Sequence, residues 1–308
     1  MDRAIEFILN GRPVRVGGVS PNTTLLAYLR GAGLTGAKEG CAEGDCGACS
    51  VAVMDRDAQG RACYRTINSC LVPLCLVAGR EIITVEGVAG RGPLHPVQET
   101  LVHCHGSQCG YCTPGFVMSL FEGYYRGDIR HPRQLDDQLS GNLCRCTGYR
   151  PIRQAAIEAF PERLRQDGPD AFVERLKKGP AGLGGVEYAF GGERFFRPAS
   201  LRGLLELVRR FPDARVVAGA TELGLEISKR FRKFPVLVSV EAVPELRGIR
   251  STAAEWRIGA AATLTQIEER VGSEFPALRD DTESSKYAGT YLVTLVLAAA
   301  TPSGSHAR

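Results

Sequence analysis

The alternation of apolar and polar residues over positions 1–85 predicts a small α+β domain. Apolar segments at residues 4–9 and 13–16 flank Asn10-Gly11, a dipeptide typical of two-residue hairpin turns. A short capped helix is expected at residues 22–33, where leucines at helical spacing end at two glycines. Three more strands are expected at residues 50–54, 62–67 and 81–85.

Beyond residue 87 the apolar spacing changes to a period of about 3.6 residues, which predicts a helical domain over residues 86–160. Helices are expected at residues 96–105, 114–125, 132–139 and 152–160. Several of them carry proline at or near the first turn, where its missing N–H costs nothing.

The rest of the chain predicts a linker followed by a third domain. Residues 161–185 are charged and then rich in glycine and proline, which is typical of a linker. From residue 186 to 308, strand-like and helix-like segments alternate, which indicates an α/β or α+β domain. Strands are expected at 215–218, 236–240 and 257–261, and helices at 221–230 and 263–270.

Composition narrows the class of protein. The 308 residues fit two or three domains, and 44% apolar and 23% charged residues exclude disordered and collagen-like chains. The net charge of +4 is spread along the chain, so neither nucleic acid nor an anionic membrane is expected as a partner. The longest uncharged apolar stretch, residues 291–300, is about half the ~20 residues of a membrane span. The first ten residues lack the pattern of a secretory signal, so a cytoplasmic chain with reduced thiols is expected.

Eight of the eleven cysteines fall into two groups of four. The first group is Cys41, Cys46, Cys49 and Cys70, and its C-x4-C-x2-C spacing is that of plant-type 2Fe-2S centres. Glycines let the loop curl around a cluster and direct N–H groups at its sulfurs, and they occur at positions 36, 40, 44 and 47. A structural zinc site is the alternative, but zinc knuckles favour C-x2-C pairs.

The second group is Cys109, Cys112, Cys144 and Cys146, and each of its two pairs lies next to a predicted helix start. On spacing alone, these thiolates could hold zinc or a second 2Fe-2S cluster. A chain with one redox centre gains an electron path from a second, which favours the cluster. The remaining cysteines, at positions 63, 75 and 104, are expected to be core residues.

The surrounding residues carry a resemblance. The segments GCAEGDCGAC, NSCLVPLC, HGSQCGYCTPG and GNLCRCTGYRPI together resemble the two-cluster region of the xanthine dehydrogenase and aldehyde oxidase family of molybdenum hydroxylases. The resemblance implies an α+β multidomain chain with a β-grasp 2Fe-2S ferredoxin domain, a four-helix 2Fe-2S domain and a partial α+β FAD-binding domain. It assigns the two cysteine groups to one cluster each. It also places Gln108 beside the pterin of a molybdenum cofactor, across a domain or subunit boundary.

The third domain contains VVAGATELGLE, residues 216–226, which is a buried strand, a tight glycine turn and a helix start able to receive a pyrophosphate. Alone this is weak evidence, since it lacks the three-glycine dinucleotide fingerprint. Within the family it resembles the first segment that contacts FAD. That match is carried by Val216, Val217, Ala218, Gly219, Ala220, Thr221, Glu222 and Leu223.

After FPALRD, residues 275–280, the resemblance breaks. The family's second glycine-rich flavin turn is replaced by DTESSKYAGTYLVTLVLAAATPSGSHAR, which keeps only AGT and TPSG. We therefore expect a truncated or frame-disrupted flavin domain that binds FAD weakly or not at all.

The resemblance implies an iron–sulfur/FAD subunit with no substrate-hydroxylating residues of its own. Electrons would pass from a molybdenum cofactor on a large partner subunit through the two clusters to FAD and NAD, within a heterotetramer. Xanthine dehydrogenase is the favoured activity, converting hypoxanthine and xanthine to urate. The alternatives are a subunit of an aldehyde, nicotinate or isoquinoline hydroxylase, or a non-enzymatic two-cluster electron carrier with a defunct flavin domain.

Overall fold

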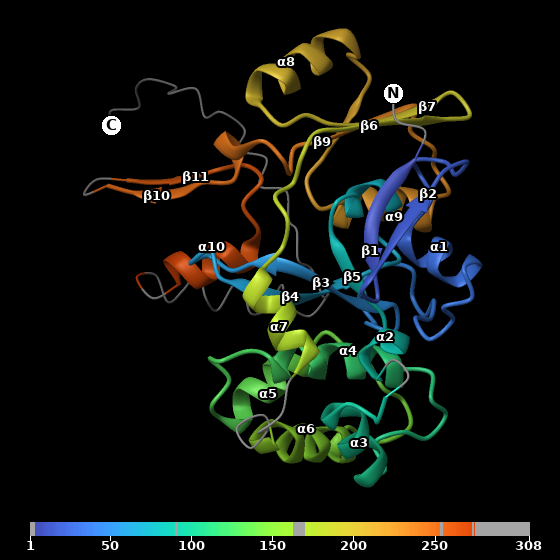
Figure 1. The fold of residues 1–308 in the computed structure, drawn as a ribbon, viewed down its shortest axis with the longest axis vertical. Helices are drawn as coiled ribbons and strands as arrows, with labels where there is room; N and C mark the ends of the chain where they lie inside the picture. Colours follow the sequence, from blue (N-terminus) through green and yellow to red (C-terminus); the bar gives the residue numbers. More distant parts are fainter. Residues whose placement is uncertain (1–3, 90–91, 163–169, 253–254, 273, 275–308) are drawn as a thin grey trace, which may run out of the picture.

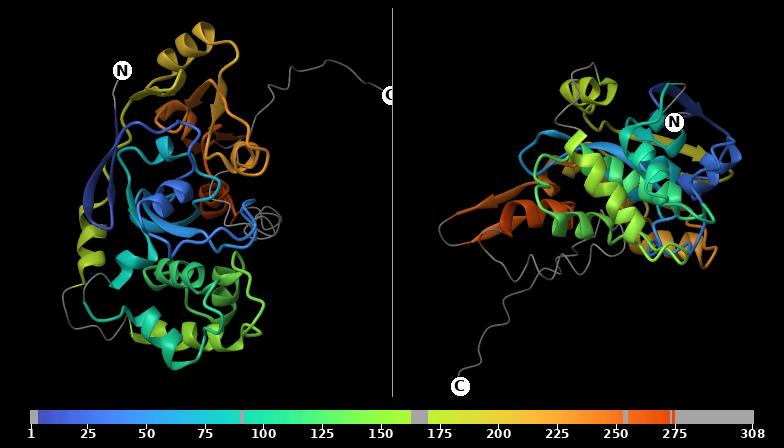
Figure 2. Two further views of the ribbon diagram at one scale, coloured as in Figure 1. Left: turned by 90° about the vertical axis from the view of Figure 1, so that its right-hand side faces the viewer. Right: turned by 90° about the horizontal axis from the view of Figure 1, so that it is seen from below.

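The computed structural model describes residues 4–89, 92–162, 170–252, 255–272 and 274. Three layers follow one another along its longest axis (Figure 1). The first domain lies in the middle, the helical domain at one end and most of the third domain at the other. Figure 2 shows the same order from the side.

The middle layer is a five-stranded sheet with strand order β2-β1-β5-β3-β4 and a helix packed on it. Its elements are β1 (Ile5–Leu9), β2 (Arg12–Val16), α1 (Leu25–Gly31), β3 (Ser50–Arg56), β4 (Ala62–Asn68) and β5 (Glu81–Ile83). Asn10 and Gly11 both adopt positive φ at the β1–β2 turn, as a two-residue hairpin requires. Strand β1 alternates buried and exposed residues, so one face of the hairpin supplies the core. The predicted ferredoxin-like sheet is therefore present.

The helical layer continues the core of the middle layer. It contains α2 (Val85–Ala89), α3 (Pro96–His103), α4 (Thr113–Tyr124), α5 (Pro132–Leu139) and α6 (Arg150–Glu162). Helix α4 is buried from Gly115 to Tyr124 because the sheet lies on one side of it and other helices on the other. Ala52, Met54 and Tyr64 of the sheet belong to the same apolar cluster as this helix. The two domains thus share one core.

The predicted linker over residues 161–185 contains a helix that the sequence analysis missed, α7 (Ala171–Lys178). The Asp170 side chain caps it by accepting the Phe172 N–H at 2.7 Å. Phe172 is buried in the shared core, and its carbonyl accepts the Tyr64 hydroxyl at 2.9 Å. One buried aromatic residue among charged neighbours gave too weak a periodic signal to predict this helix.

The third layer has a four-stranded sheet of order β6-β7-β9-β8, in which β7, β9 and β8 are parallel. Its strands and helices are β6 (Val186–Phe190), β7 (Glu193–Arg197), α8 (Leu201–Arg210), β8 (Arg215–Val217), α9 (Thr221–Ser228) and β9 (Val236–Ser239). A hairpin of β10 (Ile249–Ser251) and β11 (Trp256–Ile258) precedes α10 (Leu264–Val271). The apolar pattern of the sequence does not predict β6, β7 or α8. The fold class, α+β in several domains, is confirmed.

The third domain also shares a core with the middle layer, on the side of the sheet away from α4. Tyr188, Phe195 and Leu237 pack in one cluster with residues of β1 and α1. Two arginines cross this boundary. Arg197 is buried and donates to the carbonyls of Leu76 and Ala78, and Arg80 pairs with Glu241.

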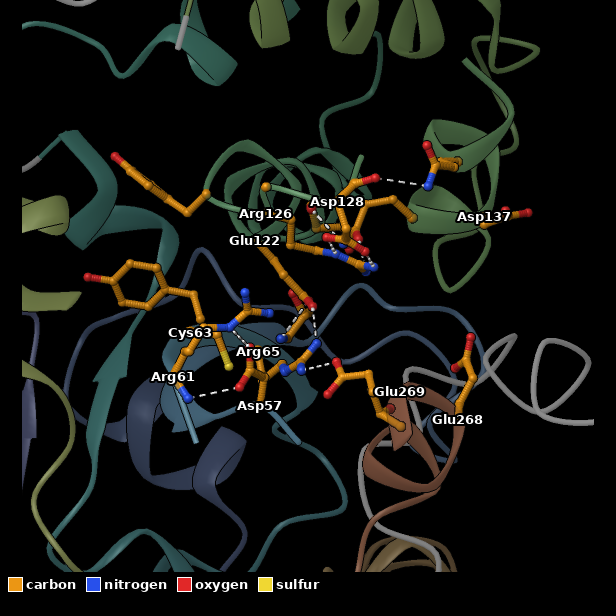
Figure 3. Close-up of a pocket in the computed structure, with 18 of the residues that line it drawn as sticks. Asp57, Arg61, Cys63, Arg65, Glu122, Arg126, Asp128, Asp137, Glu268 and Glu269 are labelled. Atoms are coloured by element: carbon orange, nitrogen blue, oxygen red, sulfur yellow. Dashed lines mark hydrogen bonds and ion pairs between the residues drawn. The ribbon is translucent and has the colours of Figure 1, made fainter. Parts of the chain in front are cut away.

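A buried ion triad joins all three domains at a pocket of about 800 Å³ (Figure 3). Arg65 of β4 forms ion pairs with Glu122 of α4 and Glu269 of α10. The carboxylates also accept backbone N–H groups, from Thr66 to Glu122 and from Ala58 to Glu269. None of the cysteines in the two groups of four lines this pocket.

Replacing Arg65 with methionine is expected to lower the free energy of unfolding by about 3–5 kcal/mol, because it leaves Glu122 buried without its cation. Chemical denaturation measures the change. The matched control is Arg257→Met, which breaks an exposed pair with Glu255 and is expected to cost at most about 1 kcal/mol. Equal effects of the two variants would contradict a stabilising role for the triad.

Burial lowers the pKa of His95 to about 4, and the nearby Asp170 carboxylate offsets this only in part. The unfolded state takes up a proton near pH 6.5 while the folded state stays neutral down to about 4. The contribution of neutral His95 to the free energy of unfolding is therefore fully present above pH 6.5 and falls by about 3 kcal/mol as the pH falls to 4.

Denaturation of the wild type and His95→Asn between pH 4 and 7.5 measures this contribution. Asparagine can still cap α3, as His95 does through its ring nitrogen, but it does not titrate. The wild type is expected to lose more stability than the variant across this range. If the free energy of unfolding changed equally with pH in both proteins, the lowered pKa of His95 would be contradicted.

Candidate functional site

The first cysteine group lies in the loop between α1 and β3, with Cys70 following β4. Its thiols come in two pairs. The sulfurs of Cys49 and Cys70 are 3.3 Å apart and buried, and Cys46 donates its backbone N–H to the Cys41 sulfur. Two thiols per iron is the arrangement that a two-iron cluster with four cysteine ligands needs.

Backbone N–H groups point at these sulfurs. The N–H groups of Glu43 and Cys46 each donate to the Cys41 sulfur at 3.4 Å. Burial raises the pKa of Cys41, but these hydrogen bonds outweigh it and the net pKa is lowered. The loop thus favours a thiolate at Cys41, the form that binds iron.

One glycine of the loop is needed for the close approach of a ligand. A Cβ atom at Gly40 would lie 2.6 Å from the Cys46 sulfur, so a side chain there would displace the thiol. The small cradle around the four sulfurs, with its N–H donors, fits a 2Fe-2S cluster.

The second cysteine group brings two distant turns together. The sulfurs of Cys109 and Cys146 are 3.5 Å apart, and burial together with the neighbouring Cys144 thiol raises the pKa of Cys112 to about 12. Helix α4 begins directly after Cys112, and α6 begins at Arg150, soon after Cys146. The four thiols again form two pairs, which fits a two-iron centre.

In each pair of the second group, one thiol is favoured as thiolate. The backbone N–H of Tyr111 lowers the pKa of Cys109. Hydrogen bonds from the side chain and backbone of Thr147 lower the pKa of Cys144 against the effect of burial. Within the described residues, no three His, Cys, Asp or Glu side chains converge on a single metal-ion position.

Hydrogen bonds join the two cysteine sites directly. The N–H of Leu143, next to Cys144, donates to the carbonyl of Cys46 at 3.0 Å. Tyr111, between Cys109 and Cys112, donates its hydroxyl to the carbonyl of Glu39 at 2.5 Å. A path through Leu143 and one hydrogen bond therefore links Cys144 of the second site to Cys46 of the first. Sequence reasoning missed these contacts because no periodic pattern marks them.

The predicted flavin segment forms a strand, a left-handed turn and a helix. Gly219 and Ala220 have φ of 83° and 63° between β8 and α9. Val217, Ala218, Gly219 and Ala220 are buried, Thr221 and Leu223 are half-buried, and Val216 and Glu222 are exposed. The N-cap residue, Ala220, makes no side-chain cap hydrogen bond, and a helix start that follows a left-handed turn is a common seat for an anion.

The other residues singled out from the sequence lie at the surface, in the core or outside the described residues. Gln108 is exposed, beside the exposed Cys109. Cys75 is fully buried, burial raises the pKa of Cys63 to about 12, and Cys104 follows α3. The segment of residues 281–308, where the resemblance is expected to break, lies outside the described part of the chain.

The fold and the paired thiols define an iron–sulfur flavoprotein, and comparisons with known proteins give its family. Residues 7–75 match the model of a 2Fe-2S iron-sulfur cluster binding domain and residues 84–157 that of a [2Fe-2S] binding domain. Residues 188–302 match the model of the FAD binding domain in molybdopterin dehydrogenase. The chain belongs to the xanthine dehydrogenase and aldehyde oxidase family of molybdenum hydroxylases and carries two 2Fe-2S domains and an FAD-binding domain.

Individual relatives agree. Xanthine dehydrogenase 2 of Arabidopsis thaliana is 34% identical over 94% of this chain and 26% of its own length. Aldehyde oxidase 2 of Mus musculus is 35% identical over 90% of this chain and 24% of its own length. The chain thus spans about a quarter of the relatives it matches. Among solved structures, quinoline 2-oxidoreductase from Pseudomonas putida 86 is 30% identical, with a TM-score of 0.46 over 54% of this chain and 98% of that one.

The family match also covers part of the segment after residue 280. The flavin-domain model extends to residue 302, through the segment where the sequence led us to expect a break. The cofactors predicted for this chain, two 2Fe-2S clusters and FAD, are those of the matched domains. No helix in the described residues has the length and apolar character to cross a bilayer.

Proposed function

We propose that this chain is the electron-transfer subunit of a molybdenum hydroxylase, and specifically of a xanthine dehydrogenase that converts hypoxanthine and xanthine to urate. The observation that carries the proposal is the hydrogen bond from Leu143 to Cys46, which links the two cysteine sites. When bound, each cluster carries one electron and the flavin carries one or two. The chain's own residues hold these carriers in sequence and shield the first cluster from water.

The assignment of ligands is part of this proposal. Each cluster would be held by one group of four cysteines, and the FAD diphosphate by the turn after β8. The paired sulfurs support the first assignment, and the left-handed turn at Gly219 and Ala220 before α9 supports the second.

The second cluster would receive electrons from a molybdenum-binding large subunit. Cys109 and Cys146 are exposed, as is Gln108, so this end of the chain is accessible to a partner's cofactor. The large subunit would bind the substrate, this chain would carry electrons to FAD and NAD, and the assembly would be a cytoplasmic heterotetramer. Because aldehyde oxidases are also relatives, an aldehyde is the second candidate substrate class.

The test is purification of the complex from its native host, followed by identification of the partner and measurement of molybdenum, iron and flavin. We expect a molybdenum-containing partner and NAD reduction with xanthine. NAD reduction with an aldehyde alone would replace the substrate but keep the subunit role. A chain that carries both clusters and has no molybdenum partner would contradict the proposal and favour a separate electron carrier.

A further inference from the structure

We propose that Gly224 is a positioning residue that seats helix α9 against the chain beside Cys70 of the plant-type site and so sets the gap for electron transfer between that cluster and FAD. This inference rests on the proposed function, because it takes the first turn of α9 as the seat of the FAD diphosphate. The helix packs on the first domain, where Ile227 of α9 belongs to the same buried apolar cluster as the leucines of α1.

The contact at Gly224 is between two backbones. Gly224 is buried, and a Cβ atom there would lie 2.7 Å from the Cα and 2.8 Å from the carbonyl carbon of Leu71. Leu71 directly follows the ligand candidate Cys70. Because backbone atoms cannot rotate away as a side-chain end can, any residue larger than glycine must push α9 away from the segment that carries Cys70.

The same helix is also tied to the other half of the ligand set. The Ser228 hydroxyl lies 2.7 Å from the carbonyl oxygen of Ala42 and 2.8 Å from that of Gly224, so both carbonyls share its one proton, and Ala42 directly follows Cys41. At the next residue, Lys229 pairs with Glu43 at 3.2 Å. Helix α9 therefore contacts the chain one residue beyond Cys41 and one residue beyond Cys70.

A shift of α9 would pass directly to the flavin turn. Gly224 follows Thr221 by three residues, which is about 4.5 Å along a helix axis. The turn and the contact therefore belong to one rigid helical turn.

The second cluster domain uses the same kind of contact. Gly115 of α4 packs on Gly47, where a Cβ atom would lie 3.0 Å from the Gly47 carbonyl carbon. Helix α4 begins directly after Cys112, and Gly47 directly follows Cys46. A glycine contact next to a ligand candidate thus brings each neighbouring domain close to the plant-type site.

The test compares Gly224→Ala with Gly31→Ala in the full chain loaded with its clusters and FAD. Gly31 ends α1, is exposed and has open space where a Cβ would be, so it controls for a helical glycine-to-alanine change. The flavin is reduced by a light flash, and bleaching of the cluster gives the transfer rate. Paramagnetic resonance measures the magnetic interaction between the reduced cluster and the one-electron-reduced flavin.

We expect Gly224→Ala to keep iron and FAD, to slow the transfer several-fold and to weaken the magnetic interaction, while Gly31→Ala changes neither. If Gly224→Ala loses FAD or fails to fold, Ser228→Ala decides, because it removes the tether to Ala42 without a clash. A wild-type rate and interaction in both α9 variants would overturn the inference and leave the proposed function intact. A wild type without flavin-to-cluster transfer would instead count against the proposed function.

Discussion

Replacing Cys146 with serine is expected to remove half of the iron and to leave the plant-type cluster intact. Cys146 is exposed, so serine costs little folding free energy, whereas a soft thiolate ligand is lost from the second site. The remaining thiols cannot supply four ligands. Iron analysis and the paramagnetic resonance spectrum of the reduced chain measure the change, and one of two cluster signals should vanish.

The matched control is Cys104→Ser, which changes a partly exposed thiol that we assign to neither cluster. It is expected to keep all the iron and both signals. Full iron in Cys146→Ser, or loss of iron in Cys104→Ser, would show that the ligand set is wrong. Zinc in place of iron in the second site of the wild type would reinstate the alternative that the cysteine spacing left open.

Replacing Gly219 with valine is expected to abolish FAD binding and to leave the iron content unchanged. Gly219 has φ of 83°, a left-handed conformation that costs a residue with a Cβ roughly 1–2 kcal/mol and is worst for a β-branched one. Relaxing this turn would redirect the N–H groups at the start of α9, and the new side chain would occupy space where backbone approaches the ligand. Flavin absorbance per iron in the purified chain measures the effect.

Gly191→Val is the matched control for backbone strain. Gly191 lies in the turn between β6 and β7 of the same domain, with φ of 61° and open space around it. It should lose stability and keep FAD. Equal loss of FAD in both variants would mean that strain anywhere in the domain releases the flavin. The wild-type ratio of FAD to iron also tests the expectation that this chain binds FAD weakly.

The sequence predicted the sites whose residues lie close together along the chain. Cys41, Cys46 and Cys49 fall in one loop, so their spacing alone limits which metal centre they can hold. The flavin turn is equally local, because one strand, two left-handed residues and one helix form it. For the second site, spacing left zinc and iron–sulfur open, and the resemblance decided between them.

The sequence did not predict elements in which a few apolar residues lie among charged ones. Helix α7 carries one buried apolar residue, Phe172, whose partners come from β4 and α4. Strands β6 and β7 gain their burial from the middle domain, and their own sequence shows little of it. Tertiary packing thus stabilises elements that local propensity does not specify.

The sequence by itself predicted the two groups of four cysteines, the glycine turn before α9 and the order of the domains, because cysteine spacing, turn residues and the apolar period can all be recognised along the chain. Only the tertiary structure decided which thiols pair, that Leu143 bonds to Cys46, and that α9 rests on Leu71. These contacts join residues far apart in sequence. They arise because the apolar faces of one sheet are each completed by a different domain, and no pattern within a single segment records that choice.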